Sequence, residues 1–305
     1  MLTVLINAYG ANDVVEVAEV ERPSPRAGEV LIKVGAAGVN PIDWKIRDGA
    51  GERMGLTLPI HLGGEFVGAV EDIGPDVWGL ERGEIVFGMV RTGAFSQYLA
   101  VNAADIVRKP GNLDITQAAA LPLAGTTAWQ AMFDEAGLCA GQRLLITGAS
   151  GGVGSLAVQL AKAKGAHVTA MTSARNAEFV RGLGADEVVD YAARPFEEIV
   201  HDIDVVLDTV GGDTFRRALA TLRKGGIMVT IVAFPDGEEA KAHRVRVKRA
   251  FTVANAGSLR AITALVEAGR VKPDVEKTFP LADIKAALAL SAAGRVRGKI
   301  VLTIE

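Results

Sequence analysis

The segment 148–154, GASGGVG, is rich in glycine in the way that is typical of an anion-binding turn. It follows the apolar run 144–146 and precedes an amphipathic stretch, so the pattern predicts a buried strand, a glycine turn and a helix. Backbone N–H groups and the positive dipole end at such a helix start bind anions such as a pyrophosphate. A strict G-x-G-x-x-G would need glycine in place of Ala149, and an ordinary strand–loop–helix is the alternative. The predicted cofactor contacts in this turn are Ser150, Gly151, Gly152 and Val153.

A second polar group follows the next predicted strand. Sites that prefer NAD carry an acidic residue about 20 positions after the glycine turn, where it holds the ribose 2′-hydroxyl. This chain has Thr172-Ser173-Ala174-Arg175 there. A hydroxyl and a guanidinium donate hydrogen bonds to a 2′-phosphate, which an acid would repel. Ser173 and Arg175 therefore predict NADPH, and the alternative for Arg175 is a surface charge at a helix start.

A third group lies in the loop Asn40-Pro41-Ile42-Asp43-Trp44-Lys45. Asp43 and Lys45 could both serve proton transfer, and Ile42 and Trp44 would line an apolar pocket. The alternatives are a solvated ion pair beside a packed tryptophan and, for Asn40, a turn residue before Pro41.

The elements that must position these groups follow from the hydrophobic pattern. Before about Ala120 the chain consists of short strand-like runs separated by glycine and proline, which predicts a compact, mostly antiparallel barrel. The predicted strands are 3–7, 14–20, 30–39, 66–73, 85–90 and 95–101. Trp78 lies in a glycine-bounded loop, and we expect it to pack against this barrel.

After about Leu121 strand-like and helical runs alternate, which predicts crossover connections and a doubly wound parallel sheet. Helices are predicted at 124–133, after the glycine turn to Gly165, at 176–183 and at 214–222, and strands at 144–146, 167–171, 187–189, 204–208 and 227–232. A strand at 247–254, a helix capped by Ser258, a helix at 284–292 and a strand at 300–304 follow. These last elements could extend the parallel sheet or return to the first domain, and periodicity leaves both open.

Composition limits the classes of function. The 305 residues carry a formal net charge of −3, which gives no global basic field for nucleic acid or an anionic membrane. The one basic concentration, 241–249, alternates with valines as in a strand with one wet face, and nucleic-acid binding there is the less favoured alternative. The single cysteine, Cys139, indicates a reducing compartment, and the N-terminal residues lack a signal-peptide pattern. We therefore expect a cytoplasmic protein.

The whole chain resembles the zinc-free quinone oxidoreductase branch of the medium-chain dehydrogenase/reductase superfamily. The matching segments are VNPIDWKIRDG at 39–49, HLGGEFVGAVEDIG at 61–74, AALPLAGTTAWQA at 119–131, GASGGVGSLAVQLAKAKGA at 148–166, TSARNAEFVRGLGADEVVDY at 172–191 and RVRGKIVL at 295–302. The resemblance implies an α/β protein with a GroES-like β-barrel catalytic domain, 1–120 with 255–305, and a Rossmann domain, 121–254. It also implies that the chain forms a homodimer through an edge strand within 247–254.

The resemblance assigns further roles to single residues. Asn40 is expected against the nicotinamide as a catalytic residue and cofactor contact, and Thr126 at the nicotinamide ribose. Tyr191 is placed as in members that take NADPH, and Arg297 in RVRGKIVL is a further expected cofactor contact. The zinc-using relatives have cysteine at the position of Asn40 and histidine at that of Gly64, so we expect no catalytic metal here.

Without a metal to polarise a plain ketone, the hydride acceptor should already be electrophilic, as a quinone or an α,β-unsaturated carbonyl compound is. A pathway-specific enoyl or enone reductase is the alternative among enzymes. A redox sensor that binds NADPH without turning over a substrate is the alternative from another class.

Overall fold

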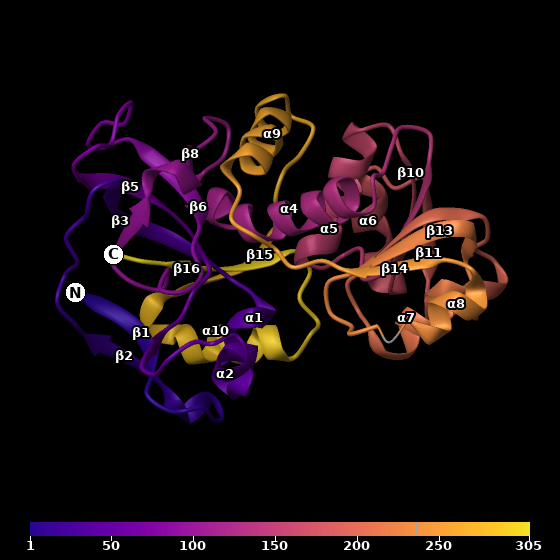
Figure 1. Ribbon diagram of the computed structural model, residues 1–305, viewed down its shortest axis with the longest axis horizontal. Helices are drawn as coiled ribbons and strands as arrows, with labels where there is room; N and C mark the ends of the chain where they lie inside the picture. Colours follow the sequence, from indigo (N-terminus) through magenta and orange to yellow (C-terminus); the bar gives the residue numbers. More distant parts are fainter. Residues whose placement is uncertain (236) are drawn as a thin grey trace. The chain divides into compact units, whose positions relative to one another are not determined.

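The computed structural model describes residues 1–235 and 237–305, and these divide into two compact units. The first unit comprises Met1–Leu123, Ala254–Thr263 and Pro273–Glu305, and the second comprises Ala124–Val253 and Ala264–Lys272. Figure 1 labels their helices and strands.

The first unit is built on two sheets. Strands β2 (Val15–Glu19), β1 (Leu2–Ile6) and β4 (Ile60–His61) form a small antiparallel sheet in that order. A larger sheet has the order β15 (Val275–Pro280), β16 (Lys299–Thr303), β3 (Glu29–Val39), β5 (Glu65–Ile73), β6 (Ile85–Met89) and β8 (Ile106–Arg108), with β7 (Tyr98–Asn102) also paired to β3. All these pairings are antiparallel except that of β15 with β16. The C-terminal strands therefore return to the first unit, and the mostly antiparallel architecture is as predicted.

Strand β3 organises the first unit because it pairs with β5, β7 and β16. Its alternating side chains join a core that also contains Phe66 and Phe95, and helix α10 (Ile284–Ala292) covers this core with Ile284 and Leu288. The first unit also contains the short α-helices α1 (Pro41–Lys45), α2 (Gly51–Arg53) and α3 (Ile115–Ala119), and the π-helix η2 (Ile46–Ala50) joins α1 to α2. The register places Val39 opposite Ile300 and Ala37 opposite Phe66, so the residues that follow β3 lie beside the starts of β5 and β16.

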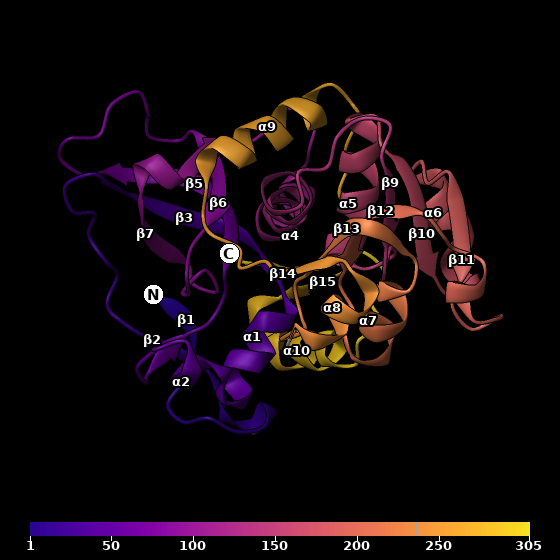
Figure 2. The ribbon, with the colours of Figure 1, turned by 45° about the vertical axis from the view of Figure 1, so that its right-hand side comes forward.

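The second unit contains a six-stranded parallel sheet. The order is β11 (Glu187–Asp190), β10 (His167–Thr172), β9 (Arg143–Ile146), β12 (Ile203–Asp208), β13 (Leu222–Thr230) and β14 (Arg246–Arg249). Helices α5 (Gly152–Ala163) and α6 (Ala177–Gly182) cover one face, and α7 (Gly212–Leu219) and α8 (Glu238–His243) cover the other (Figures 1 and 2). Strand order reverses between β9 and β12, as in a doubly wound fold. The predicted fold class is confirmed.

Two helices cross the division between the units: α4 (Pro122–Trp129) and α9 (Ala256–Glu267). Helix α9 begins before Ser258, and the Asn255 side chain, rather than Ser258, caps it by accepting from the Ser258 N–H at 3.0 Å. The predicted cap was therefore wrong by three residues, because both side chains are good caps and the sequence does not rank them.

Two other predictions were wrong. Strand β14 ends at Arg249 instead of Ala254, and Arg244, at the end of α8, has a left-handed φ of 57°, so the basic stretch is divided between a helix and a strand. Trp78 does not pack against the barrel, because 87% of it is exposed. Apolar residue type alone predicted burial in both places, but loop and edge positions leave such side chains in solvent.

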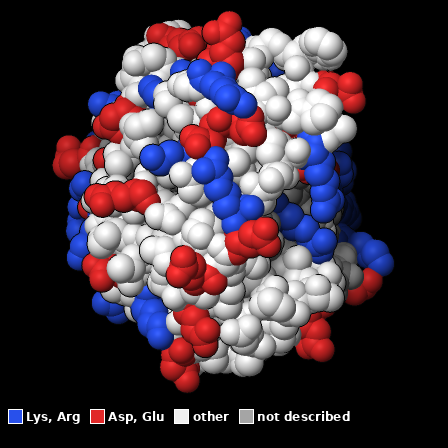
Figure 3. Space-filling model, turned by 90° about the vertical axis from the view of Figure 1, so that its left-hand side faces the viewer, with Lys and Arg blue, Asp and Glu red and all other residues white. Residues whose placement is uncertain are grey.

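Within residues 1–235 and 237–305, no helix has both the length and the apolar character that crossing a bilayer requires. The face drawn in Figure 3 carries acidic and basic side chains interspersed, which fits the small net charge.

Candidate active site

The glycine turn predicted to bind a pyrophosphate connects β9 to α5. Ser150, Gly151, Gly152 and Val153 all lie in this turn or in the first turn of α5 and are partly exposed. The helix packs against its own turn at Gly154, where a Cβ atom would lie 2.2 Å from the Gly148 carbonyl oxygen. Only glycine permits this approach, and the first N–H groups of α5 have no helical acceptor. The turn therefore has the form of an anion-binding helix start.

Three of the predicted contacts come just after the carboxyl ends of two neighbouring strands, and so lie at the same end of the sheet. Ser173 and Arg175 come directly after β10, and Tyr191 comes directly after β11. Arg175 is exposed, as is 54% of Tyr191. In doubly wound sheets ligands bind at the carboxyl ends of the strands, beside the point where strand order reverses. The structure thus brings the glycine turn, Ser173, Arg175 and Tyr191 to one edge.

Hydrogen bonds join the glycine turn to the segment after β10. The Ser150 hydroxyl oxygen lies 3.0 Å from Thr172 Oγ1 and 3.0 Å from Asn176 Nδ2, and both donate to it. Thr172 and Asn176 were not among the predicted site residues. Their bonds fix Ser150 relative to the segment that carries Arg175.

At the same carboxyl end of the sheet, the residues that follow the other strands include exposed apolar side chains. Val210, Phe234 and Phe251 follow β12, β13 and β14 and are 52%, 81% and 68% exposed. The guanidinium carbon of Arg249 lies 3.6 Å from the ring centroid of Phe234 and 5.0 Å from that of Phe251. Burial lowers the pKa of Arg249 from its usual value. Exposed aromatic rings held by a cation at a ligand-binding edge suit a flat apolar ligand.

A buried carboxylate fixes the loops beside the strand-order reversal. Asp208, fully buried at the end of β12, accepts from Thr147 Oγ1 at 3.0 Å, Thr230 Oγ1 at 2.7 Å and the Gly211 N–H at 2.9 Å. These partners follow or end β9, β13 and β12. Sequence reasoning missed this group, although an acid at the end of an apolar strand is its visible signal.

Thr126 lies in the part of α4 that belongs to the second unit. It is fully buried, and its Oγ1 atom has no hydrogen-bond partner among the described residues. A buried hydroxyl without a partner costs stability unless a ligand satisfies it. The glycine turn, the polar groups after β10 and β11, and this hydroxyl fit a dinucleotide cofactor.

The first unit holds a buried polar cluster around Asn40. The Asn40 side chain, on a residue that is 6% exposed, donates from Nδ2 to Glu65 Oε1 at 2.8 Å and to the Gly38 carbonyl at 3.1 Å. Lys299 Nζ donates to Asn40 Oδ1 and lies 2.7 Å from Glu65 Oε1. A Cβ atom on Gly38 would lie 2.2 Å from Glu65 Oε1, so glycine is required there. Lys299 was not predicted as a site residue.

Asp43 belongs to the same cluster. It is 1% exposed, and its Oδ2 atom accepts from the Asn40 N–H at 2.7 Å. Burial raises the pKa of Asp43 from 3.8 to about 7, against the lowering effects of the Asn40 N–H and the Lys299 ammonium. Asp43 is therefore not the solvated ion-pair partner that the alternative required. Lys45 is partly exposed, with Nζ 5.5 Å from the Trp44 ring centroid.

Arg297 lies in the first unit, just before β16. Its N–H donates to Glu276 Oε2 at 2.7 Å, and its Nε atom lies 3.4 Å from Asp274 Oδ2. The Arg297 guanidinium thus pairs with the Asp274 carboxylate, whereas the bond to Glu276 involves only the main-chain N–H of Arg297. Its predicted cofactor contact stays a prediction.

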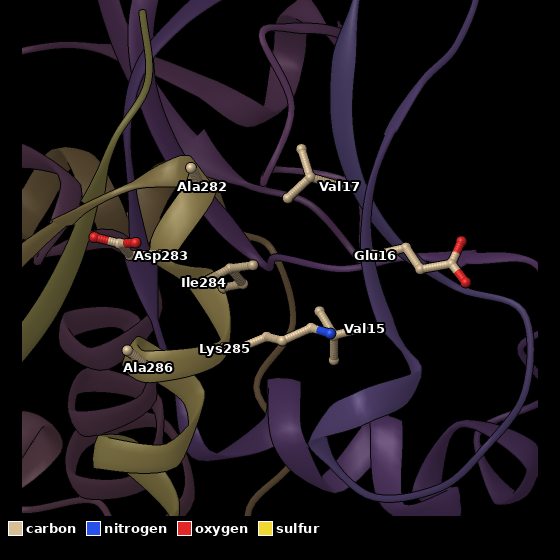
Figure 4. Close-up of a pocket in the computed structure, with 8 residues that line it drawn as sticks. All are labelled: Val15, Glu16, Val17, Ala282, Asp283, Ile284, Lys285 and Ala286. Atoms are coloured by element: carbon tan, nitrogen blue, oxygen red, sulfur yellow. The ribbon is translucent and has the colours of Figure 1, made fainter.

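A hollow of about 490 Å³ lies elsewhere in the first unit, between β2 and the start of α10 (Figure 4). Its lining includes Val15, Glu16, Val17, Asp283, Ile284 and Lys285. The Glu16 carboxylate points away from α10, while the Lys285 side chain extends toward Val15. This hollow contains none of the predicted site residues.

Metal-ligand types do not converge in the described part of the chain, where no group of three His, Cys, Asp or Glu side chains could hold an ion. Where the zinc-using relatives have cysteine and histidine, this chain has Asn40 and Gly64, and the remaining Glu65 is paired with the Lys299 ammonium.

Comparison with known proteins adds the family. Residues 26–111 match the model of the alcohol dehydrogenase GroES-like domain, and residues 183–302 match that of the zinc-binding dehydrogenase. The chain is 36% identical to the mouse mitochondrial NAD(P)H oxidoreductase RTN4IP1, over 98% of this chain and 88% of the relative. Among solved structures, the quinone oxidoreductase from Coxiella burnetii superposes with a TM-score of 0.93 at 32% identity, covering 100% and 99% of the two chains. The Escherichia coli quinone oxidoreductase complexed with NADPH superposes with a TM-score of 0.91 at 25% identity, covering 99% and 100%.

Proposed function

The chain belongs to the zinc-free, quinone oxidoreductase-like branch of the medium-chain dehydrogenase/reductase superfamily, and from that premise we propose that it transfers a hydride from NADPH to a quinone or an α,β-unsaturated carbonyl compound. The observation that carries the proposal is the row of groups after β9, β10 and β11: a glycine turn, then Ser173 and Arg175, then Tyr191. The two quinone oxidoreductase structures, one of them complexed with NADPH, support it.

The choice of NADPH rests on Arg175. The N–H groups of residues 150–153 would hold the pyrophosphate, and Ser173, Arg175 and Tyr191 the 2′-phosphate. A hydrogen bond to a charged group contributes about 1.5–3 kcal/mol, or roughly tenfold to a hundredfold in affinity. Arg175 is exposed to screening by solvent, so we expect the lower end of that range.

NADPH, when bound, supplies the hydride, and the protein's own groups position and protonate. Asn40 and Thr126 are the proposed contacts of the nicotinamide end. Lys45 is the better direct proton donor, because Asp43 is buried and could exchange its proton only through a bridging group. The exposed rings of Phe234 and Phe251 suit a flat, apolar acceptor.

The test is a side-by-side measurement of NADPH and NADH affinity and oxidation with a panel of quinones and enones, in the presence of a chelator. We expect turnover with NADPH and an affinity at least about tenfold better than for NADH. Arg175→Ala should weaken NADPH by a similar factor and leave NADH nearly unchanged, with Arg181→Ala, on the exposed face of α6, as the matched control. Equal loss of both cofactors in Arg175→Ala would contradict the role given to Arg175.

The same panel separates the alternatives. A pathway-specific enone reductase would accept enones and refuse simple quinones. A redox sensor would bind NADPH and turn over neither class.

We also propose a homodimer, because β14 lies at the edge of the six-stranded sheet and an unpaired edge invites pairing with a second copy. The compartment stays a prediction: the single cysteine favours the reducing cytoplasm, whereas the mouse relative is named as mitochondrial.

A further inference from the structure

In the part of the second unit that the structure describes, two arginines lie over phenylalanine rings, and they differ in their partners. The guanidinium carbon of Arg217 lies 4.8 Å from the Phe196 ring centroid, and its Nη2 atom lies 2.8 Å from Glu197 Oε2. Arg249 has no carboxylate partner among residues 1–235 and 237–305. The hydrogen bond to Glu197 raises the pKa of Arg217, whereas burial lowers the pKa of Arg249. The positive charge of Arg249 is therefore not neutralised by any described side chain.

The Arg249 guanidinium also has unused hydrogen-bond donors. Nη1 donates to the main-chain oxygens of Val232 at 2.9 Å and Ala233 at 2.5 Å. Nε is buried without an acceptor, and Nη2, which is not buried, has none among the described residues either. A guanidinium carries five N–H groups, and donors that lack both water and an acceptor cost stability. An anionic oxygen bound at Nη2 would satisfy the charge and a donor together.

The rings beside this guanidinium are exposed. Phe234 and Phe251 follow β13 and β14 at the carboxyl end of the sheet and are 81% and 68% exposed. The guanidinium carbon lies 3.6 Å and 5.0 Å from their ring centroids, so one cation is attracted to both rings. Phe196, the ring under Arg217, is 1% exposed and belongs to the core. Arg217 is thus a packing residue with its own counterion, whereas the group around Arg249 combines exposed apolar rings with a cation that has none.

We propose that Arg249 determines substrate specificity by binding a carboxylate carried on a flat apolar acceptor, whose body lies against Phe234 and Phe251. This inference rests on the proposed function, in which these rings bind a quinone or an enone. The guanidinium fork matches the two oxygens of a carboxylate, and partial burial strengthens their attraction. A neutral acceptor of the same shape would cover the cation without satisfying its charge, so the anionic acceptor should bind more tightly.

The test compares an anionic acceptor, 1,4-naphthoquinone-2-carboxylate, with its neutral methyl ester. Arg249→Met removes the guanidinium and keeps an unbranched side chain beside the rings. The kcat/KM for each compound is measured with NADPH in both proteins, and the ratio of acid to ester is compared. We expect this ratio to fall about tenfold in Arg249→Met, the size of one hydrogen bond to a charged group. Loss of the bonds to Val232 and Ala233 would lower both values together and leave the ratio unchanged.

Arg217→Met is the matched control, because it removes an arginine that lies over a ring but has its own carboxylate partner. Its ratio of acid to ester should equal that of the wild type. A titration of the cofactor-free protein with 2-naphthoate and 2-naphthamide measures binding without turnover. The wild type should bind 2-naphthoate about tenfold more tightly than 2-naphthamide, and Arg249→Met should bind the two alike. Added salt should reduce the difference, since Arg249 is partly exposed.

An acid-to-ester ratio that is the same in Arg249→Met and in the wild type would overturn the inference. A wild type that binds 2-naphthoate and 2-naphthamide alike would overturn it as well. In both cases turnover of the two quinones with NADPH would leave the proposed function standing. A wild type that oxidises NADPH with no quinone or enone would instead overturn the proposed function, and this inference with it.

Light scattering covers the other source of a carboxylate, a second copy of the chain paired through β14. A monomer mass for Arg249→Met beside a dimer mass for the wild type, with the acid-to-ester ratio unchanged, would show that Arg249 binds that copy. The inference would then be wrong, because the guanidinium would belong to the interface.

Discussion

Replacing Asp43 with asparagine should stabilise the protein at high pH and not at low pH. The pKa of Asp43 is raised from 3.8 to about 7 by burial, so the unfolded chain releases this proton near pH 4 and the folded chain keeps it to about pH 7. Stability therefore falls as the pH rises between these values, and the penalty is complete above about pH 7. Two pKa units lie between pH 5 and the folded pKa, which corresponds to about 3 kcal/mol. An asparagine at position 43 would not titrate, and its side-chain oxygen could still accept from the Asn40 N–H.

Urea unfolding of both proteins at pH 5 and pH 8 measures this effect, with Trp44 in the same helix as a fluorescent reporter. The stability difference between Asp43→Asn and wild type should increase by about 3 kcal/mol between the two pH values. A constant or decreasing difference would refute the assignment of a raised pKa to Asp43. The same variant tests the proton-donor role, because losing a general acid lowers kcat by about a hundredfold or more. A smaller loss at pH 5, where Asp43 carries its proton in the folded wild type, would favour Lys45 or solvent as the donor.

Three further outcomes are expected. Thr126→Val removes a buried hydroxyl without a partner among the described residues, so the melting temperature of the cofactor-free protein should rise by about 2–4 °C in a thermal-shift assay. The same variant should bind NADPH more weakly in a titration. A melting temperature that falls would indicate that the hydroxyl has a partner. Gly154→Ala would place a methyl group 2.2 Å from the Gly148 carbonyl oxygen and should lower the affinities for NADPH and NADH together. Gly182→Ala, with open space around its Cβ, should change neither affinity. Equal behaviour of the two variants would refute the packing argument. Light scattering at micromolar concentration should give a dimer mass, and a monomer mass would contradict pairing through β14.

Most of the parallel sheet was predictable because its strands, except β14 with the sequence RVKR, contain short apolar runs ended by glycine or polar residues. Helix 284–292 was predicted with the bounds that the structure has. Prediction failed at 250–254, where Phe251 and Val253 alternate as in a strand but are 68% and 64% exposed. Alternation of apolar residues indicates which side chains could share one face of a strand. It does not indicate whether a neighbouring strand or a ligand covers that face.

The groups around Asn40 were predictable only in part, because hydrogen bonds across a sheet join distant parts of the chain. Asn40 and Asp43 are three residues apart, and their residue types indicated a site, although the segment predicted as a loop is the N-cap and first turn of helix α1. Lys299 lies 259 positions from Asn40, in a strand where a lysine ordinarily faces solvent. The register of β16 against β3 is what makes it a buried partner, and that register depends on the whole first unit.

The absence of a cysteine at position 40 and a histidine at position 64 is not the only feature of this cluster that disfavours zinc. Gly64 leaves room for a Cβ atom, which would meet Leu123 at 3.6 Å and the Val90 carbonyl oxygen at 3.7 Å, both ordinary contacts. The Lys299 ammonium, however, bonds to Glu65 and Asn40 and would repel a divalent cation brought to the same side chains. Cysteine at 40 and histidine at 64 would not be sufficient for a zinc site while Lys299 remains, because the carboxylate that would bind zinc already neutralises a buried positive charge.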